Sequence, residues 1–208
     1  MKLLVLGGTG GTGKQIVSQA LEAGHDVTVL ARDRAKAGPD RPRLRIVPGD
    51  LENAAALAEA MRGQEAVISA IGRGYSFKSE RLMERTVPGI VAVMTSSGPR
   101  RLVFTSAFGV GESFADAPLV PRLFFSTLLR GIYADKLVGE RSIRSSRLDW
   151  TIVRPTKMTD GPLTRTYRSG DRIPTSGGAS ISRADVAHYL LLAVGDAGTV
   201  GKTVVVSN

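Results

Sequence analysis

A glycine-rich run near the start of the chain has the composition of a phosphate-binding loop. It lies between a short apolar run at residues 2–6 and a helical pattern, and it reads Gly7-Gly8-Thr9-Gly10-Gly11-Thr12-Gly13. Glycine lets the backbone turn tightly and approach a phosphate, while the free N–H groups at a helix start attract negative charge. Close packing of a turn does not by itself explain five glycines in seven residues. We therefore predict that the pyrophosphate of a nicotinamide dinucleotide is held by Gly7, Thr9, Gly10, Gly11, Thr12 and Gly13.

The end of the second apolar run selects between the two nicotinamide dinucleotides. A carboxylate at this point accepts from the ribose 2′-hydroxyl, whereas an arginine holds a 2′-phosphate. The sequence places Arg32 there, with Arg34 nearby and Asp33 one position too late to face the ribose. We expect NADP(H) as the cofactor, the alternative being that Arg32 is an ordinary surface arginine.

Two later strand ends are expected to complete the cofactor groove. Asp50 and Leu51 follow the third apolar run, where adenine would lie, and Ile71 and Gly72 follow the fourth. Ligands bind at the carboxyl ends of strands in open parallel sheets, so all four residues are predicted to contact the cofactor. Arg73 either reaches a phosphate or faces solvent.

The elements that position these residues alternate between short β-branched runs and longer segments of helical period. This alternation is typical of βαβ units, and 208 residues correspond to one domain. We predict a single α/β domain, a doubly wound parallel sheet of Rossmann type spanning residues 1–208. Strands are expected at residues 2–6, 26–31, 44–47, 66–71, 101–105, 150–154 and 202–206, and helices near 12–23, 52–61, 79–95, 123–145 and 184–194. Loops near 72–80, 107–121 and 156–180 are expected to form the substrate cleft.

The composition excludes several kinds of chemistry. There are no cysteines and only two histidines, which rules out thiolate catalysis and disulfides and leaves little for a metal site. The net charge of +9 favours anionic partners, but no dense basic run is present, so nucleic acid is an unlikely partner. The first apolar run is too short for a secretion signal or a membrane span, and we expect a cytoplasmic protein.

With these residues in place, the chain resembles the atypical short-chain dehydrogenase/reductase proteins. It is most similar to the group of biliverdin-IXβ reductase and flavin reductase, and NmrA-like proteins are related. The resemblance runs nearly end to end and is carried by the glycine loop and by residues 27–33, 49–50, 105–108, 148–155 and 181–186. It implies an NADPH-dependent reductase that is a monomer or a weak homo-oligomer.

The resemblance also suggests site residues. Ser106 ends the fifth strand, where the family hydrogen-bonds substrate or nicotinamide, and Lys136 begins a Lys-x-x-x-Glu pattern that ends at Glu140. We assign Ser106 and Lys136 as catalytic, the alternative for Ser106 being a helix-cap or turn hydroxyl. Lys136 could hold the nicotinamide ribose, or Lys136 and Glu140 could form a helix-surface ion pair. The superfamily places a tyrosine four residues before the lysine, whereas here Tyr133 precedes it by three and Ile132 takes the usual place. Tyr133 is therefore either a displaced proton donor or a packed aromatic.

Pro155 and Thr156, after the sixth strand, are expected beside the cofactor. Biliverdin-reducing relatives carry a histidine two residues after this proline, and Lys157 replaces it here, which argues against a tetrapyrrole substrate. The leading hypothesis is hydride transfer from NADPH to a planar acceptor such as a flavin or quinone, without a metal or a membrane. The alternative is a non-catalytic redox sensor of the NmrA type. An apolar wall for the acceptor could be formed by Phe104, Phe108, Phe114, Leu119, Pro121, Phe124 and Phe125, with core packing as the alternative for at least half of these rings.

Overall fold

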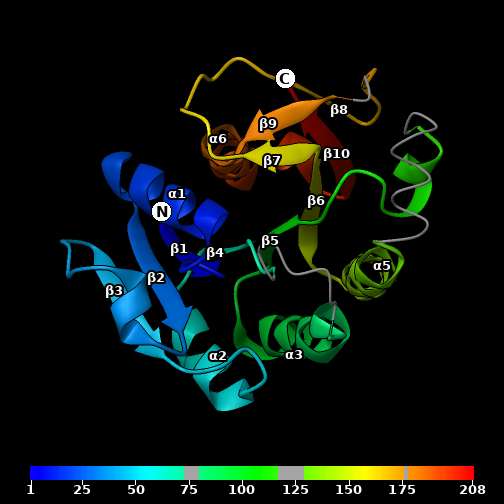
Figure 1. Cartoon of the computed structure of the whole chain (residues 1–208). Helices are drawn as coiled ribbons and strands as arrows, with labels where there is room; N and C mark the ends of the chain where they lie inside the picture. Colours follow the sequence, from blue (N-terminus) through cyan, green and yellow to red (C-terminus); the bar gives the residue numbers. More distant parts are fainter. Residues whose placement is uncertain (73–79, 117–128, 176–177) are drawn as a thin grey trace.

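An eight-stranded sheet runs through the centre of the computed structural model, which describes residues 1–72, 80–116, 129–175 and 178–208 (Figure 1). The strands lie in the order β3-β2-β1-β4-β5-β6-β10-β8, and all neighbours are parallel except β10 and β8. Their bounds are β1 Lys2–Leu6, β2 Asp26–Ala31, β3 Leu44–Pro48, β4 Ala66–Ser69, β5 Arg101–Thr105, β6 Asp149–Pro155, β8 Arg168–Gly170 and β10 Lys202–Ser207. The predicted doubly wound α/β fold is confirmed.

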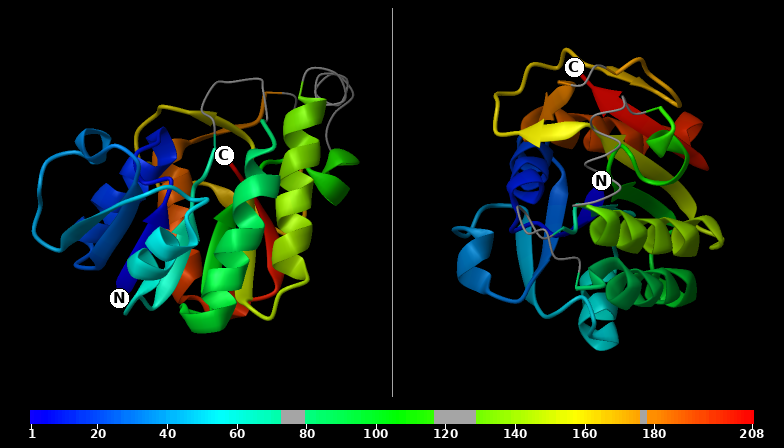
Figure 2. Two further views of the ribbon diagram at one scale, coloured as in Figure 1. Left: turned by 90° about the horizontal axis from the view of Figure 1, so that it is seen from below. Right: turned by 45° about the vertical axis from the view of Figure 1, so that its right-hand side comes forward.

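Helices cover both faces of the sheet (Figure 2). One face carries α1 (Gly11–Glu22) and α6 (Arg183–Gly195), which pack against each other. The opposite face carries α2 (Ala54–Met61), α3 (Leu82–Ser97) and α5 (Arg130–Arg144). Within the described ranges, no helix is both long and apolar enough to cross a bilayer.

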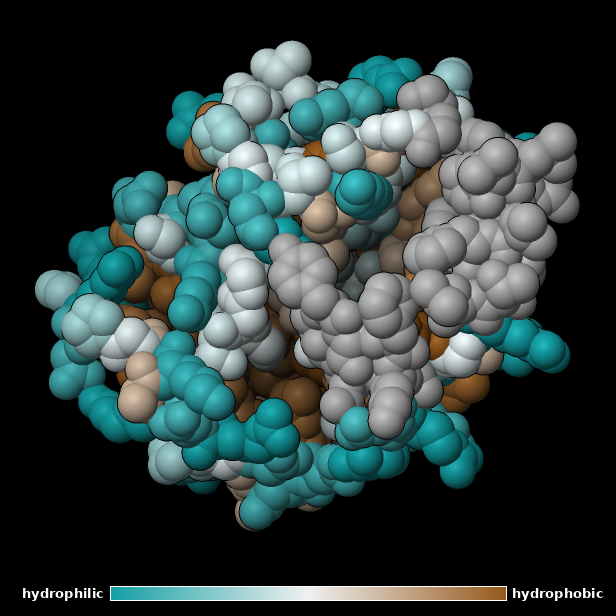
Figure 3. Space-filling view, viewed as in Figure 1, coloured by the Kyte–Doolittle hydropathy of each residue, from teal (hydrophilic) through white to brown (hydrophobic). Residues whose placement is uncertain are grey.

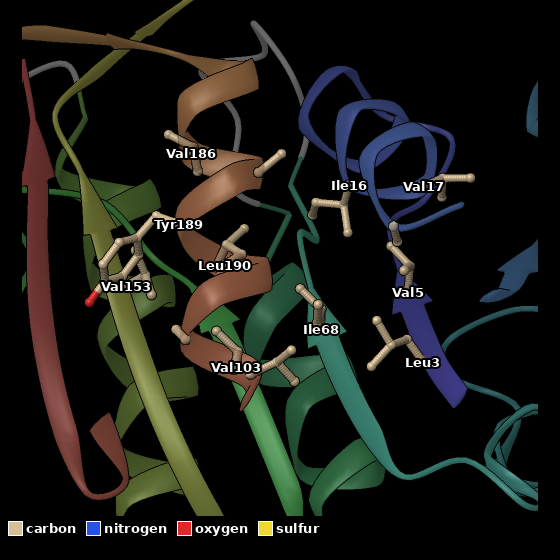
Figure 4. Close-up of a cluster of buried hydrophobic side chains, with 14 of the residues drawn as sticks. Leu3, Val5, Ile16, Val17, Ile68, Val103, Val153, Val186, Tyr189 and Leu190 are labelled. Carbon is tan, nitrogen blue, oxygen red and sulfur yellow. The ribbon is translucent and has the colours of Figure 1, made fainter. Parts of the chain in front are cut away.

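The strands read as continuous apolar runs because both of their faces are buried. In β1, Val5 faces α1 and α6, while its neighbours Leu4 and Leu6 face the opposite helical layer. Figure 4 shows Val5 and Ile68 of the sheet against Ile16 of α1. This double burial is typical of parallel sheets and explains why short β-branched runs predicted the strands.

Three short strands lie outside the predicted pattern. β7 (Lys157–Thr159) and β9 (Ser180–Ser182) form a separate parallel pair, and β8 pairs antiparallel with β10. The expectation of βαβ order throughout is therefore wrong in the last third of the chain, and β8 lies in a segment expected to be loop. Each of these strands has three residues, too few for a hydrophobic period to be recognised.

The helix boundaries differ from the predicted ones by a few residues, for local reasons. α2 begins at Ala54 because the Asn53 side chain accepts hydrogen bonds from two N–H groups of the first turn. α3 starts at Leu82, where 79–95 was expected. α5 is described from Arg130, and part of the expected helix 123–145 lies outside the described residues.

The chain reverses its direction of winding between β1 and β4, and the glycine loop lies at that point. Gly7 follows β1 with φ +78°, and a Cβ there would lie 2.6 Å from the carbonyl oxygen of Ala70, after β4. A Cβ on Gly13 would lie 2.0 Å from the carbonyl oxygen of Gly7. These contacts hold the loop, the sheet and α1 together without side chains, at the topological switch where such sheets bind ligands.

Substitution of Gly13 provides a test of this packing. We expect Gly13→Ala to destabilise the protein by about 3 kcal/mol or more, because the backbone of Gly7 must move to accommodate the methyl group. Gly89, an exposed glycine inside α3 with no atom near its Cβ position, is the control. Gly89→Ala should stabilise by about 0.5–1 kcal/mol. Equal unfolding midpoints for the two variants in urea would contradict the packing argument.

Candidate cofactor and active site

The glycine loop leaves the first turn of α1 open toward solvent. Gly10 is the N-cap residue of α1, and no side chain caps the helix. The loop closes on itself through a hydrogen bond of 3.0 Å from the Gly10 N–H to the Gly7 carbonyl. No acidic residue lies in the first turn, so its N–H groups and the helix dipole face a space without competing negative charge. This arrangement suits a diphosphate.

Two cavities meet at this loop. The larger has a volume of about 510 Å³ and the smaller about 230 Å³. Figure 3 shows this face of the molecule, with hydrophobic residues in its recesses and hydrophilic residues over most of its rim. The residues common to both cavities are Gly10, Ala70, Ile71, Gly72 and Leu82. An elongated ligand can therefore lie across the carboxyl edge of the sheet with its middle at the glycine loop.

The larger cavity contains the residues predicted to bind the adenosine end. Arg32, Asp50 and Leu51 all line it, and Arg32 Nε lies 3.6 Å from an Asp50 carboxylate oxygen. The Arg32 side chain is 83% exposed, so it is free to turn toward a ligand. Asp33 is turned away, as expected, and accepts a hydrogen bond from the Ala35 N–H. Arg34 is paired with Asp40 at 2.5 Å and does not line the cavity.

A second arginine lines the larger cavity and was not predicted. Arg85 of α3 pairs with Glu52, and both residues belong to the cavity wall. They are 33 positions apart in the sequence, so only the packing of α3 beside the β3 to α2 connection brings them together.

The smaller cavity contains buried hydroxyl groups without partners. Ser106 is 2% exposed, and its backbone N–H donates to the Val153 carbonyl at 2.7 Å. The hydroxyls of Ser106 and Thr105 both lack a hydrogen-bond partner among the described residues, and both residues line the cavity. A buried hydroxyl is normally satisfied, so two orphaned ones at a strand end indicate a place for a ligand. Ser106 was predicted here and Thr105 was not.

Lys136 lines the same cavity, and the two nearby carboxylates, Asp135 and Glu140, are bonded to other groups. Asp135 accepts hydrogen bonds of 3.0 Å from the N–H groups of Met83 and Glu84 and so caps α3. Glu140 is fully buried and paired with Arg154, so the predicted helix-surface ion pair of Lys136 and Glu140 is wrong. Burial lowers the pKa of Lys136 to about 8, against the weaker opposing effect of these two carboxylates.

Tyr133 does not line the cavity, which favours the packed aromatic among the two alternatives. Its hydroxyl donates to the Phe108 carbonyl at 3.1 Å, and burial raises its pKa, which makes it a poorer proton donor. Ile132, which takes the usual tyrosine place in the sequence, lines the cavity. Because the tyrosine is shifted by one position, an aliphatic side chain lines the cavity where the superfamily pattern places the tyrosine hydroxyl.

The model of the NAD(P)H-binding family matches residues 7–197. The chain belongs to this NAD(P)H-binding family. The match covers the glycine loop and every strand from β2 to β9, so the cofactor class predicted from the glycine spacing is confirmed.

Known proteins resemble this NAD(P)H-binding chain along most of its length. An uncharacterized chloroplastic protein of Arabidopsis thaliana is 33% identical over 171 residues, covering 78% of this chain and 61% of that protein. A bifunctional pinoresinol-lariciresinol reductase of Linum corymbulosum is 24% identical over 222 residues, covering 97% of this chain and 67% of that protein. The chain thus spans about two thirds of the length of these relatives.

A solved structure shares the fold. It is a short-chain dehydrogenase/reductase of Veillonella parvula in complex with NADP, with a TM-score of 0.84 and 19% identity over 100% of this chain and 94% of that chain. The likeness at this identity is one of fold, and it agrees with the resemblance to short-chain dehydrogenase/reductase proteins that the sequence indicates.

Other predicted site residues of the NAD(P)H-binding chain lie outside the two cavities. Pro155 ends β6, and the Thr156 hydroxyl donates to the Ser207 hydroxyl at 3.0 Å. Neither residue lines the smaller cavity, whereas Met158, from the following strand β7, does. Phe104 and Phe108 belong to buried clusters, which makes the predicted aromatic wall wrong at those two positions. Outside the described residues are Arg73, Leu119, Pro121, Phe124 and Phe125.

Arg183 and Asp185 stand close together at the start of α6 with different roles. Arg183 lines the smaller cavity, packs over Gly11 and pairs with Asp160 at 2.6 Å. Asp185 is buried and bonded to Ser182 and to the N–H groups of Thr164 and Arg165, so it stabilises the start of α6 and does not line either cavity. The helical period of the sequence does not show which of Arg183 and Asp185 lines a cavity. Among the described residues no group of histidine and carboxylate side chains forms a metal site.

Replacement of Lys136 tests the electrostatics of the smaller cavity. We expect Lys136→Met to raise the melting temperature at pH 7 by about 2–4 °C, the shift given by 1 kcal/mol, because an unpaired ammonium is costly to bury. The folded-state pKa of about 8 lies below that of an unfolded lysine, about 10.4, so the wild type gains stability as pH rises through this window and the difference shrinks.

Exposed Lys202 at the start of β10 is the matched control, and Lys202→Met should change the melting temperature by less than about 1 °C. Thermal unfolding by circular dichroism at pH 7 and pH 10 measures both effects. A Lys136→Met variant less stable than the wild type at pH 7 would show that the ammonium group is not buried at a cost.

Proposed function

We propose that the protein is an NADPH-dependent reductase that passes a hydride to a planar small-molecule acceptor, flavin or quinone-like compounds being the first choice. The observation that carries this proposal is that two polar groups line the cavity beside the glycine loop. They are the Ser106 hydroxyl, which has no hydrogen-bond partner among the described residues, and the Lys136 ammonium, which has no ion-pair partner there. The family match and the relation to a plant reductase support it.

In this proposal the dinucleotide lies across both cavities. Arg32 would hold the 2′-phosphate, with Asp50 and Leu51 beside the adenosine, and Gly10 to Gly13 would hold the diphosphate through their N–H groups. The nicotinamide end would then occupy part of the smaller cavity, near Ser106. Bound there, the reduced nicotinamide supplies the hydride.

Ser106 and Lys136 would handle the proton and the orientation of the acceptor. The Ser106 hydroxyl, without an internal partner, is available to a carbonyl oxygen of ligand or acceptor. Lys136, whose pKa burial lowers to about 8, would give its proton to the acceptor oxygen that gains negative charge and regain one from water. A flavin can take its proton from water, so that acceptor would depend on Lys136 less than a quinone does.

The lining of the smaller cavity favours a flat and largely apolar acceptor. Its walls include Leu82 and Met83 from α3, Ile132 from α5 and Met158 from β7. Methionine and aliphatic side chains pack against ring faces without demanding hydrogen bonds. Of the loops predicted to form the cleft, near residues 72–80, 107–121 and 156–180, the described residues Gly72, Ala107 and Met158 line the smaller cavity, and residues 73–79, 117–121 and 176–177 lie outside the described part of the chain.

The alternative function is a redox sensor that binds the dinucleotide and reports its oxidation state to a protein partner. The observation that favours it is the position of Tyr133, whose hydroxyl is bonded to the Phe108 carbonyl and not directed to the cavity. A sensor must bind NADP⁺ and NADPH with different affinities, because equal binding of both shifts no equilibrium.

Calorimetric titration tests the cofactor preference. We expect Arg32→Ala to weaken NADPH binding tenfold to a hundredfold, about 1.5–3 kcal/mol, through loss of a charged hydrogen bond to the 2′-phosphate. NADH affinity should change less than about twofold. Arg34→Ala is the control because it removes the same charge two residues away. An NADPH-to-NADH affinity ratio that survives Arg32→Ala would remove the assignment.

Turnover with a panel of acceptors tests the reductase proposal. We expect steady NADPH oxidation with FMN or a quinone, and a loss of about 10²-fold or more in kcat with quinone for Lys136→Met, because proton transfer is lost. Ser106→Ala should fall about tenfold. Tyr133→Phe is the control and should stay within about twofold. Tight NADPH binding without oxidation across the panel would contradict the proposal, and a differing NADP⁺ affinity would then support the sensor.

A further inference from the structure

A buried ion pair connects β6 to α5, the helix that carries Lys136. Arg154 Nε donates to one carboxylate oxygen of Glu140 at 3.1 Å, and its terminal nitrogen donates to the other at 2.6 Å. The side chains are 2% and 0% exposed. In this bidentate pair each carboxylate oxygen of Glu140 accepts a hydrogen bond from the Arg154 guanidinium.

Lys136 lies one helical turn before Glu140 on α5, the spacing at which a lysine and a glutamate normally pair. It has no ion-pair partner in the part of the chain that the structure describes. Its other neighbouring carboxylate, Asp135, is engaged by two backbone N–H groups at the start of α3. Lys136 is thus an ammonium group beside two carboxylates, both of which are held by other groups.

We propose that Arg154 is a positioning residue for Lys136: by occupying both oxygens of Glu140 it keeps that carboxylate from pairing with the lysine, which stays free in the cavity. Its catalytic consequence rests on the proposed role of Lys136 as proton donor, but the interaction itself does not. Arg154 acts through Glu140 and lines neither cavity.

The surrounding charges are consistent with this role. Glu112, from the short helix η2 (Gly111–Phe114), also pairs with Arg154 at 3.1 Å and with Arg144 at 3.1 Å. Arg144 reaches Glu140 only at 3.5 Å, so Arg154 is the main partner of that carboxylate. The charged groups that act on Lys136 or share its cavity are Asp135 and Glu140 of α5 and Arg183 of α6, and the ion pairs of Glu140 add Arg154, Arg144 and, through them, Glu112.

A purely structural role for Arg154 is the competing explanation. An ion pair that only ties β6 to α5 would, when broken, reduce stability without moving the titration of Lys136. Removal of Arg154 alone leaves Glu140 with only Arg144, at 3.5 Å, as an ion-pair partner, and this loss of compensation for a buried charge is unfavourable unless another cation pairs with it. Lys136, four residues before it, is such a cation.

The titration of Lys136 in cofactor-free protein measures the proposal directly. Reductive methylation with ¹³C-formaldehyde labels the lysines, of which there are seven, and Lys136→Arg identifies the Lys136 signal. We expect Arg154→Met to move the midpoint of that signal upward by about one pH unit or more, because the released Glu140 favours the ammonium form. The double variant Arg154→Met with Glu140→Gln should return the midpoint close to that of the wild type.

Two further variants keep the test decisive. Glu140→Gln alone leaves the guanidinium with less compensation and should move the Lys136 midpoint downward, so the proposal remains testable if Arg154→Met does not fold. Arg101→Met is the control for general destabilisation, because Arg101 is bonded to backbone carbonyls of β6 and α6. It should leave the midpoint unchanged.

A Lys136 midpoint that is the same in the wild type, Arg154→Met and Glu140→Gln would overturn the proposal and leave a structural ion pair. Because the titration needs neither cofactor nor turnover, a protein without reductase activity would still give either result. With activity present, the alkaline limb of the pH profile for quinone reduction should move in the same direction as the midpoint in each variant.

Discussion

The contact between bare backbone segments at the glycine loop is the constraint on which the rest of the site depends. The space between Gly13 and the carbonyl oxygen of Gly7 is too small for a single methyl group. Because no side chain intervenes, α1 begins directly above the ends of β1 and β4, and its first-turn N–H groups are directed to the carboxyl edge of the sheet. Gly10 lines both cavities, so the other residues of the site lie on either side of this loop.

Polar groups around that loop differ in whether the protein itself satisfies them. Asp185, which lines neither cavity, is bonded to Ser182 and to the N–H groups of Thr164 and Arg165. The hydroxyls of Thr105 and Ser106, which line the smaller cavity, have no partner among the described residues. Since a buried polar group without a partner costs about 1–3 kcal/mol, such groups are expected where a ligand completes them. Because these hydroxyls lie beside the glycine loop, a ligand whose phosphates bind the loop can reach them with its other end.

Local pattern predicted the sheet strands other than β8, the glycine loop and the position of Arg32 and Asp50 at the cavity wall, because each depends only on its neighbours in sequence. Ser106 was assigned from the family resemblance together with its place at a strand end. It did not predict Arg183 or Arg85 in the cavity walls, since their positions depend on how distant helices pack. Lys136 was assigned from a family pattern whose expected partner, Glu140, is instead buried against Arg154. Only the three-dimensional arrangement distinguishes a surface pair from this buried one.

The electrostatics of Lys136 bear on the choice between a reductase and a sensor. A protein that only binds the dinucleotide needs the glycine loop and Arg32, and can use Lys136 to hold the nicotinamide ribose whether or not the lysine releases a proton. An ammonium group held without a carboxylate partner is therefore not required for binding alone. It costs free energy, which pairing with Glu140 would recover. The chain instead uses Asp135 to cap α3 and Arg154 to hold Glu140, and so leaves the lysine able to release a proton near neutral pH. A lysine in that state is suited to proton transfer, which favours the reductase over the sensor.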